Sequence, residues 1–104
     1  MRESRDSDGT VRLTLIGELD IAVVNAFGDR LRQYADSGQA VRLDLSELDF
    51  IDSSGVQAVV LGVRDARQRG LSLEVDPHIS ATTKRMVEIM GVGPHLWPAE
   101  QSPG

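Results

Sequence analysis

The sequence predicts one α/β domain with a mostly parallel or mixed sheet of four to five strands and helices packed mainly on one face. The chain has 104 residues, which is too few for a second hydrophobic core. Strand-like and helix-like spacings of apolar residues alternate along it, and this order favours parallel pairing through right-handed crossovers. The strand segments are apolar on one face only, whereas strands covered by helices on both faces are continuously apolar.

Three segments have the period of two that is typical of a half-buried strand, because successive side chains point to opposite faces of a sheet. The second of them is expected to end near Leu45, with a short connection after it. Their apolar residues are Val11, Leu13 and Leu15; Val41, Leu43 and Leu45; and Leu71, Leu73 and Val75.

Helical spacing follows each strand segment. Apolar residues recur at steps of three and four, and a glycine marks the expected end of each helix. Ser80 is the expected N-cap of the third helix. The predicted helices run over about residues 22–36, before Gly38; over residues 53–69, before Gly70; and from Ser80 to Gly91.

The predicted domain covers residues 11–97, after a short N-terminal segment of residues 1–10. Residues 98–104 (PAEQSPG) contain nothing that a core could bury, so we expect a disordered tail. The charged first residues lack the apolar stretch of a secretory signal, and the longest apolar run is too short to span a bilayer.

Composition and charge exclude several classes of function. The net charge of −5 disfavours direct binding to nucleic acid or to anionic membrane surfaces. The chain has no cysteine, which removes disulfides, thiolate catalysis and cysteine metal sites and fits the reducing cytoplasm. The carboxylates between residues 44 and 52 are expected to scatter along a strand and a turn, so we predict no metal site and no cofactor.

The turn Asp52-Ser53-Ser54-Gly55 leads directly into the second predicted helix. Aspartate or serine at this boundary can accept hydrogen bonds from first-turn amides that have no partner inside the helix. Helix capping is therefore a sufficient explanation of the turn when it is considered alone.

The wider pattern resembles the STAS domain of bacterial anti-sigma-factor antagonists. GELD at residues 17–20, DLSELDFIDSSG at residues 44–55 and SATTKRM from Ser80 carry the resemblance, which extends from about Val11 to Gly91. It implies a single STAS-like domain. It also implies an antagonist that binds an anti-sigma factor, which is itself a serine protein kinase, and is released when that kinase phosphorylates Ser53. Sigma-factor-dependent transcription would be regulated in this way.

Six residues are candidates for partner binding. A helical wheel places Ser54, Ala58 and Leu61 opposite the apolar stripe of the second helix, although Leu61 is also explained as an ordinary surface leucine. The resemblance places Asp20 near the phosphorylation turn, and its alternative role is to cap the first helix. The candidates are Asp20, Asp52, Ser54, Gly55, Ala58 and Leu61.

Catalysis and an adaptor role are the two other candidate functions. Ser53 is not predicted to be catalytic, because neither His78 nor His95 lies in a recognisable nucleophile motif and no Walker-type phosphate loop is present, so the chain is not expected to be an enzyme. A phosphorylation-independent STAS adaptor subunit of a transport or signalling complex is the alternative. The short C-terminal region is also expected to leave a sheet edge or an apolar groove open, which would allow a homodimer.

Overall fold

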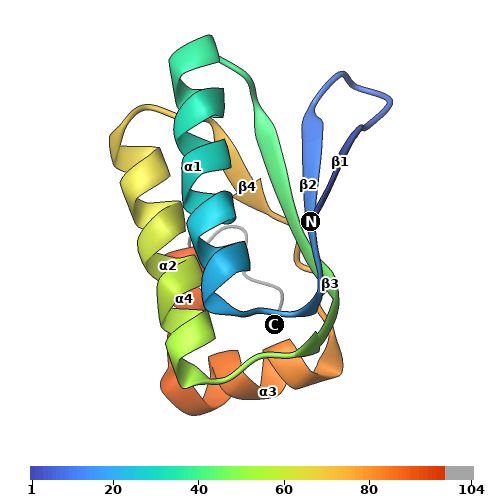
Figure 1. Ribbon diagram of the computed structural model, residues 1–104, viewed down its shortest axis with the longest axis vertical. Coiled ribbons are helices and arrows are strands. Elements are labelled where there is room, and N and C mark those ends of the chain that lie inside the picture. The colour runs from blue at the N-terminus through green and yellow to red at the C-terminus, as the bar shows by residue number, and fades with distance from the viewer. Residues whose placement is uncertain (98–104) are drawn as a thin grey trace.

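A computed structural model describes residues 1–97 and contains one four-stranded sheet in the order β1-β2-β3-β4 (Figure 1). The strands are β1 (Arg2–Arg5), β2 (Val11–Glu18), β3 (Val41–Phe50) and β4 (Leu73–Val75). β1 pairs with β2 in antiparallel orientation, and the other two pairings are parallel. The predicted α/β domain with a mixed sheet is therefore confirmed. The predicted tail lies outside the described residues.

The strands differ from the prediction in three places. β1 lies in the N-terminal segment and forms a hairpin with β2; all four of its residues are exposed, so no apolar alternation marks it in the sequence. β3 does not end near Leu45 but continues to Phe50, because its pairing with β2 resumes beyond an irregularity in the register. At this irregularity Asp44 Oδ1 accepts hydrogen bonds from Ser46 N and Oγ at 2.8 and 2.6 Å. That irregularity interrupts the period of two while the strand goes on. β4 begins at Leu73 and not at Leu71.

The helices agree with the prediction closely because their ends carry local signals. Asp20, Asp52 and Ser80 each cap a helix by accepting a hydrogen bond from a backbone N–H three residues later. Gly38 and Gly91 end two of the helices in the left-handed conformation, with φ of 72° and 66°. The helices are α1 (Ile21–Ser37), α2 (Ser53–Gln68), α3 (Ala81–Met90) and the short α4 (Gly93–Leu96), which was not predicted.

The core lies between the sheet and the helices. α1 and α2 lie side by side along one face of the sheet, and α3 lies across the end at which β2 and β3 finish (Figure 1). The inward residues of β2 and β3 are almost fully buried, and the inward stripe of α2 meets them. The best-buried members of this core are Val11, Leu13, Leu15, Val41, Leu43, Leu45, Phe27, Leu31, Val56, Val59 and Val63.

The other face of the sheet carries a network of ion pairs. Arg12 on β2 donates hydrogen bonds to the carboxylates of Asp6, Asp44 and Asp76 at 2.8, 2.9 and 3.0 Å. Arg42 on β3 pairs with Asp6 as well. This arrangement explains why β2 and β3 are apolar on one face only, since charged side chains and not a second helical layer occupy their outer face.

The β4 edge of the sheet is covered by two side chains. Alternate residues of β4 bond to β3, so the carbonyls of Leu73 and Val75 point toward the free edge. Arg67 Nε and Nη2 donate to Leu73 O at 3.2 and 3.1 Å, and Trp97 Nε1 donates to Val75 O at 2.9 Å. These two carbonyls of the β4 edge are therefore not open, whereas β1, at the other edge of the sheet, is exposed along its length.

The contact between α1 and α2 gives a paired prediction. Gly62→Ala is expected to lower the free energy of unfolding by about 1–3 kcal/mol, because a Cβ there would lie 2.8 Å from Phe27 Cε2. Gly28 is the matched control: a Cβ there would meet Arg32 Nη1 at 3.6 Å, an ordinary contact. Gly28→Ala should therefore raise stability by about 0.5–1 kcal/mol through helix propensity. Urea unfolding of both variants tests this, and effects of the same sign would contradict it.

Candidate functional site

The carboxyl ends of β2 and β3 bring together two loops that are far apart in the sequence. Glu18 pairs with Phe50 in the parallel register, and Leu19 N donates to Phe50 O at 3.4 Å. Each strand is followed at once by a helix, so α1 and α2 begin at the same end of the molecule, the lower end in Figure 1. Asp20 and Asp52, the two N-caps, therefore both lie at this end.

The turn at residues 52–55 is organised by the carboxylate of Asp52. Its Oδ1 accepts hydrogen bonds from Gly55 N at 2.8 Å and from Ser54 Oγ at 2.7 Å. The bond from the Gly55 amide, followed by the bond from the Ser54 hydroxyl, lowers the pKa of Asp52 below its ordinary value. The carboxylate next to Ser53 is thus held in its ionised form.

Ser53 is the first residue of α2, and its side chain is exposed. The hydroxyl that bonds to Asp52 is that of Ser54, so this cap does not engage Ser53. An incoming group can reach a hydroxyl at such a position without unfolding the helix. The amino end of a helix also carries partial positive charge, which tolerates an added anion.

Gly55 allows the start of α2 to lie tightly against the neighbouring loop. It is buried, and a Cβ at this position would lie 3.0 Å from Ile51 Cγ1 and 3.3 Å from Leu19 Cδ2. Leu19 directly precedes the N-cap of α1, so this contact joins the two helix starts. The sequence motif therefore has a packing role at Gly55 in addition to any role in binding.

Asp20 caps α1 by accepting a hydrogen bond from Val23 N at 2.9 Å. The capping role that the sequence left open is therefore present. The resemblance also predicts that Asp20 lies near the turn of Ser53. In the structure the loop that carries Asp20 adjoins the end of β3 that leads to this turn. Asp20 is exposed, and one of its oxygens is engaged in the cap.

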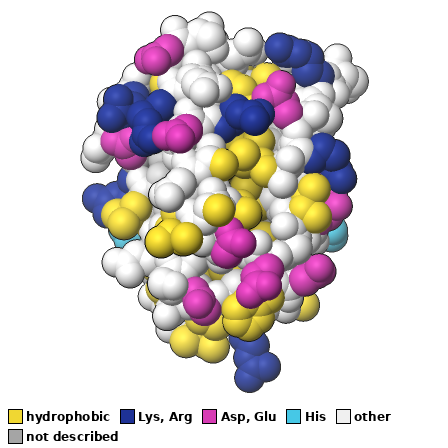
Figure 2. All heavy atoms as spheres, in the orientation of Figure 1, with side chains coloured by type: hydrophobic (Ala, Val, Ile, Leu, Met, Phe, Trp, Pro, Cys, Tyr) yellow, Lys and Arg dark blue, Asp and Glu magenta, His cyan; other side chains and the backbone are white. Residues whose placement is uncertain are grey.

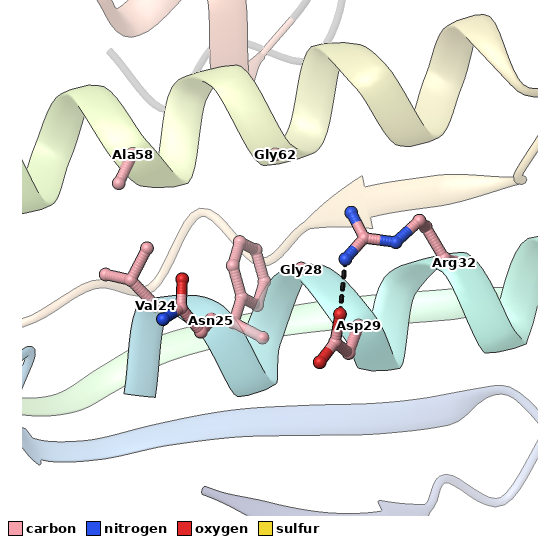
Figure 3. A pocket seen from close by; sticks show the side chains of 8 residues that line it. Val24, Asn25, Gly28, Asp29, Arg32, Ala58 and Gly62 are labelled. Carbon is pink, nitrogen blue, oxygen red and sulfur yellow. Dashed lines mark hydrogen bonds and ion pairs between the residues drawn. The ribbon is translucent and has the colours of Figure 1, made fainter. Parts of the chain in front are cut away.

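The two candidates farther along α2 point in different directions. Leu61 is 54% exposed, as the helical wheel predicted. Ala58 is half-buried and faces α1, where it helps line a hollow of about 450 Å³ between the two helices (Figure 3). Asp29 and Arg32 of α1 form an ion pair on the opposite side of this hollow. Ala58 is therefore less accessible than Ser54 or Leu61.

Two exposed apolar residues at this end were not singled out from the sequence. Ile21, the first residue of α1, is 79% exposed, and Phe50, the last residue of β3, is 54% exposed. Phe50 follows the buried Leu48 at the spacing of a strand, which predicts burial and not exposure. No local signal identifies either residue.

Across residues 1–97 no group of three or more histidine, cysteine, aspartate or glutamate side chains is arranged to hold a metal ion. In the same residues no helix has the length and apolar character needed to cross a membrane.

The sequence is similar to a known protein family and to a known bacterial protein. A family model described as "Mlab, STAS domain" matches residues 3–97. The anti-sigma-B factor antagonist of Bacillus subtilis (strain 168) is 22% identical over 88 residues, which are 85% of this chain and 80% of that protein.

Two solved structures are similar as well. That of the anti-sigma factor antagonist SpoIIAA in its unphosphorylated form matches with a TM-score of 0.69 and 25% identity, covering 89% of this chain and 82% of that one. The crystal structure of Mglu matches with a TM-score of 0.60 and 29% identity over 72% of this chain, which corresponds to only 19% of the Mglu chain.

Proposed function

The chain belongs to the STAS domain family, and on that premise we propose that it is an anti-sigma-factor antagonist that binds an anti-sigma factor while Ser53 is unphosphorylated. Phosphorylation of Ser53 by that anti-sigma factor, acting as a serine protein kinase, releases it and so regulates sigma-factor-dependent transcription. The observation that carries the proposal is an exposed Ser53 at the start of α2, inside the motif that resembles the antagonists.

The partner-binding surface of this proposal follows the start of α2. Asp52, Ser54 and Gly55 form the turn around the phosphorylated residue, and Asp20 belongs to the adjoining loop. Leu61 extends the surface by two turns of α2, and Ala58 contributes from the side that faces α1.

A phosphoryl group at Ser53 can release the partner without a large change in this chain. It adds a charge of about −1.5 to −2 at neutral pH, beside a carboxylate that is already ionised. A partner surface shaped for a neutral hydroxyl would have to desolvate that charge, at a cost on the order of several kcal/mol. The helix start tolerates the phosphate in the free protein.

The chemistry of this exchange belongs to the partner. The kinase activity and its ATP are assigned to the anti-sigma factor, and we propose no catalytic residue, metal or cofactor for this chain. The exchange would take place in the cytoplasm, without direct contact between this chain and nucleic acid or membrane. Any homodimer would have to form without the carbonyls of Leu73 and Val75, which are already bonded.

A phosphorylation assay tests the proposal. The purified chain is incubated with ATP and, in turn, with each anti-sigma factor encoded in the same genome, and the modified residue is mapped by mass spectrometry. We expect one phosphate, on Ser53, and loss of the complex as it accumulates. The Ser53→Ala variant should remain unmodified and bound. A phosphate on Ser54 in place of Ser53 would contradict the assignment.

A phosphorylation-independent adaptor is the second candidate. The observation in its favour is the cap itself, because Asp52 and Ser54 account for much of the turn through helix capping alone. An adaptor would form a stable complex whose affinity does not change with the phosphorylation state of Ser53. The same assay therefore separates the two functions.

A further inference from the structure

Two large apolar side chains are exposed in adjoining segments, one at the end of β3 and one at the start of α1. Phe50 ends β3, and Ile21 opens α1 two residues after Leu19, whose N–H donates to Phe50 O. Single exposed apolar residues are common on protein surfaces. Here two of the most exposed ones in residues 1–97 lie at the same end as Ser53.

Four exposed carboxylates belong to the same two segments: Glu18 pairs with Phe50 in the β2–β3 register, Asp20 precedes Ile21, and Asp49 and Asp52 lie on either side of Phe50 in the sequence. Within residues 1–97 none of them forms an ion pair, whereas the carboxylates on the outer face of the sheet are held by arginines. Figure 2 shows acidic and hydrophobic side chains together over the lower part of the face, with basic side chains above them and at the lowest point of the face. We call the surface formed by Ile21, Phe50 and these four carboxylates the acidic end.

The charge of the acidic end restricts what can cover it. Phosphate backbones and anionic lipid headgroups would be repelled. A second copy of the chain, docked through the same surface, would place carboxylates against carboxylates. The complementary surface is one that offers an apolar pocket for Phe50 and Ile21 and arginine or lysine side chains around it.

We propose that the acidic end is the docking surface for a protein partner with an apolar pocket and a cationic rim. This inference deepens the function proposed above, because it names the chemistry of the partner surface that meets the Ser53 end. The apolar side chains hold the complex and set its dissociation rate. The carboxylates steer the partner and set the association rate and its dependence on salt.

Binding kinetics with the anti-sigma factors of the same genome test these separate roles. Phe50→Ala is expected to raise Kd about 30-fold, mainly through faster dissociation. The double variant Glu18→Gln, Asp49→Asn is expected to slow association about tenfold at low salt and to flatten its salt dependence. Both changes spare the helix caps Asp20 and Asp52. Asp36→Asn, near the opposite end of α1, is the charge control and should leave both rates unchanged.

The outcomes separate this inference from the proposed function. If Ser53→Asp abolishes binding while Phe50→Ala and the double variant bind like the wild type, the switch stands and the docking surface is wrong. If no anti-sigma factor binds at all, peptides can still probe the surface. Two short peptides with the same Leu/Phe centre, one flanked by lysines and the other by glutamates, are titrated into isotope-labelled protein, and the NMR chemical shifts are followed. Shifts at Phe50 and Ile21 with the lysine peptide alone support the inference. Equal shifts with both peptides, or shifts elsewhere, overturn it.

Discussion

Replacing Ser53 with aspartate is expected to abolish binding of the anti-sigma factor, with a loss of affinity of about a thousandfold or more, whereas Ser53→Ala should bind as well as the wild type. The new carboxylate lies beside Asp52, whose charge is stabilised by its hydrogen bonds to Gly55 N and Ser54 Oγ. Desolvating an added unpaired charge in a closed interface costs on the order of several kcal/mol, which corresponds to the stated loss of affinity.

Isothermal titration calorimetry of the two variants measures this difference, and a thermal melt shows that it is not caused by unfolding. Aspartate in the first turn of a helix is favourable, so the melt of Ser53→Asp should match or slightly exceed that of the wild type. Gln33→Glu, on the exposed surface of α1, adds one negative charge elsewhere and should leave binding intact. If Ser53→Asp binds the anti-sigma factor with the affinity of the wild type, the result would contradict the switch and favour the adaptor function.

Replacing Arg12 with methionine is expected to lower the free energy of unfolding near neutral pH by about 2–3 kcal/mol, somewhat below the range for breaking a fully buried pair. The Arg12 side chain is 26% exposed, and that of its partner Asp44 is 12% exposed. The substitution keeps an apolar stem but removes the donor that holds Asp6, Asp44 and Asp76 together. Three carboxylates would then face one another across the outer face of the sheet.

This cost should depend on pH in a defined direction. Burial raises the pKa of Asp44, but the hydrogen bonds from Ser46 and from Arg12 outweigh it, so the pKa lies below its ordinary value. A depressed carboxylate pKa contributes stability that is present above the unfolded pKa and is lost as the pH falls through the folded pKa. Without Arg12 the pKa of Asp44 rises, so the cost of the substitution should shrink as the solution is acidified.

Urea unfolding of wild type and Arg12→Met at neutral and at acidic pH measures this trend. The matched control is Arg69→Met, which removes an exposed ion pair with Asp65 whose side chains are 52% and 50% exposed. A change within about 0.5 kcal/mol is expected for that pair. A cost of Arg12→Met that stays the same in acid would show that lost packing of the side chain, and not the carboxylates, causes it.

The helices were predictable because the signals that start and stop a helix are local. Asp52 and Ser80 are followed three residues later by the amides that they cap, and Gly38 and Gly91 supply the left-handed residue at two helix ends. The inward stripe of α2 follows from its own spacing, which also placed Leu61 on the surface correctly. The exposure of Ser53 at the start of α2 follows from the same local pattern.

The sheet was predictable only where its strands repeat with a period of two. β1 has no buried residue, so no apolar spacing in the sequence predicts it. Only the structure shows its pairing with β2. The extension of β3 to Phe50 depends on the irregular pairing with β2. The covering of the β4 edge depends on Arg67 at the end of α2 and on Trp97, which is 22 residues after Val75.

The sequence alone therefore determined the α/β class, the ends of the three long helices and the turn that contains Ser53, because each depends on residues a few positions apart. Only the tertiary structure decided that Ile21 and Phe50 are exposed, and that arginines hold the outer face of the sheet. The proximity of Asp20 to the turn of Ser53 was expected from the family resemblance, and the structure supplies the strand pairing behind it. The physical reason is that exposure and proximity depend on which strands become neighbours. Parallel pairing of β2 with β3 brings together residues about thirty positions apart. The spacing of apolar residues within one segment does not predict which segment will pair with it.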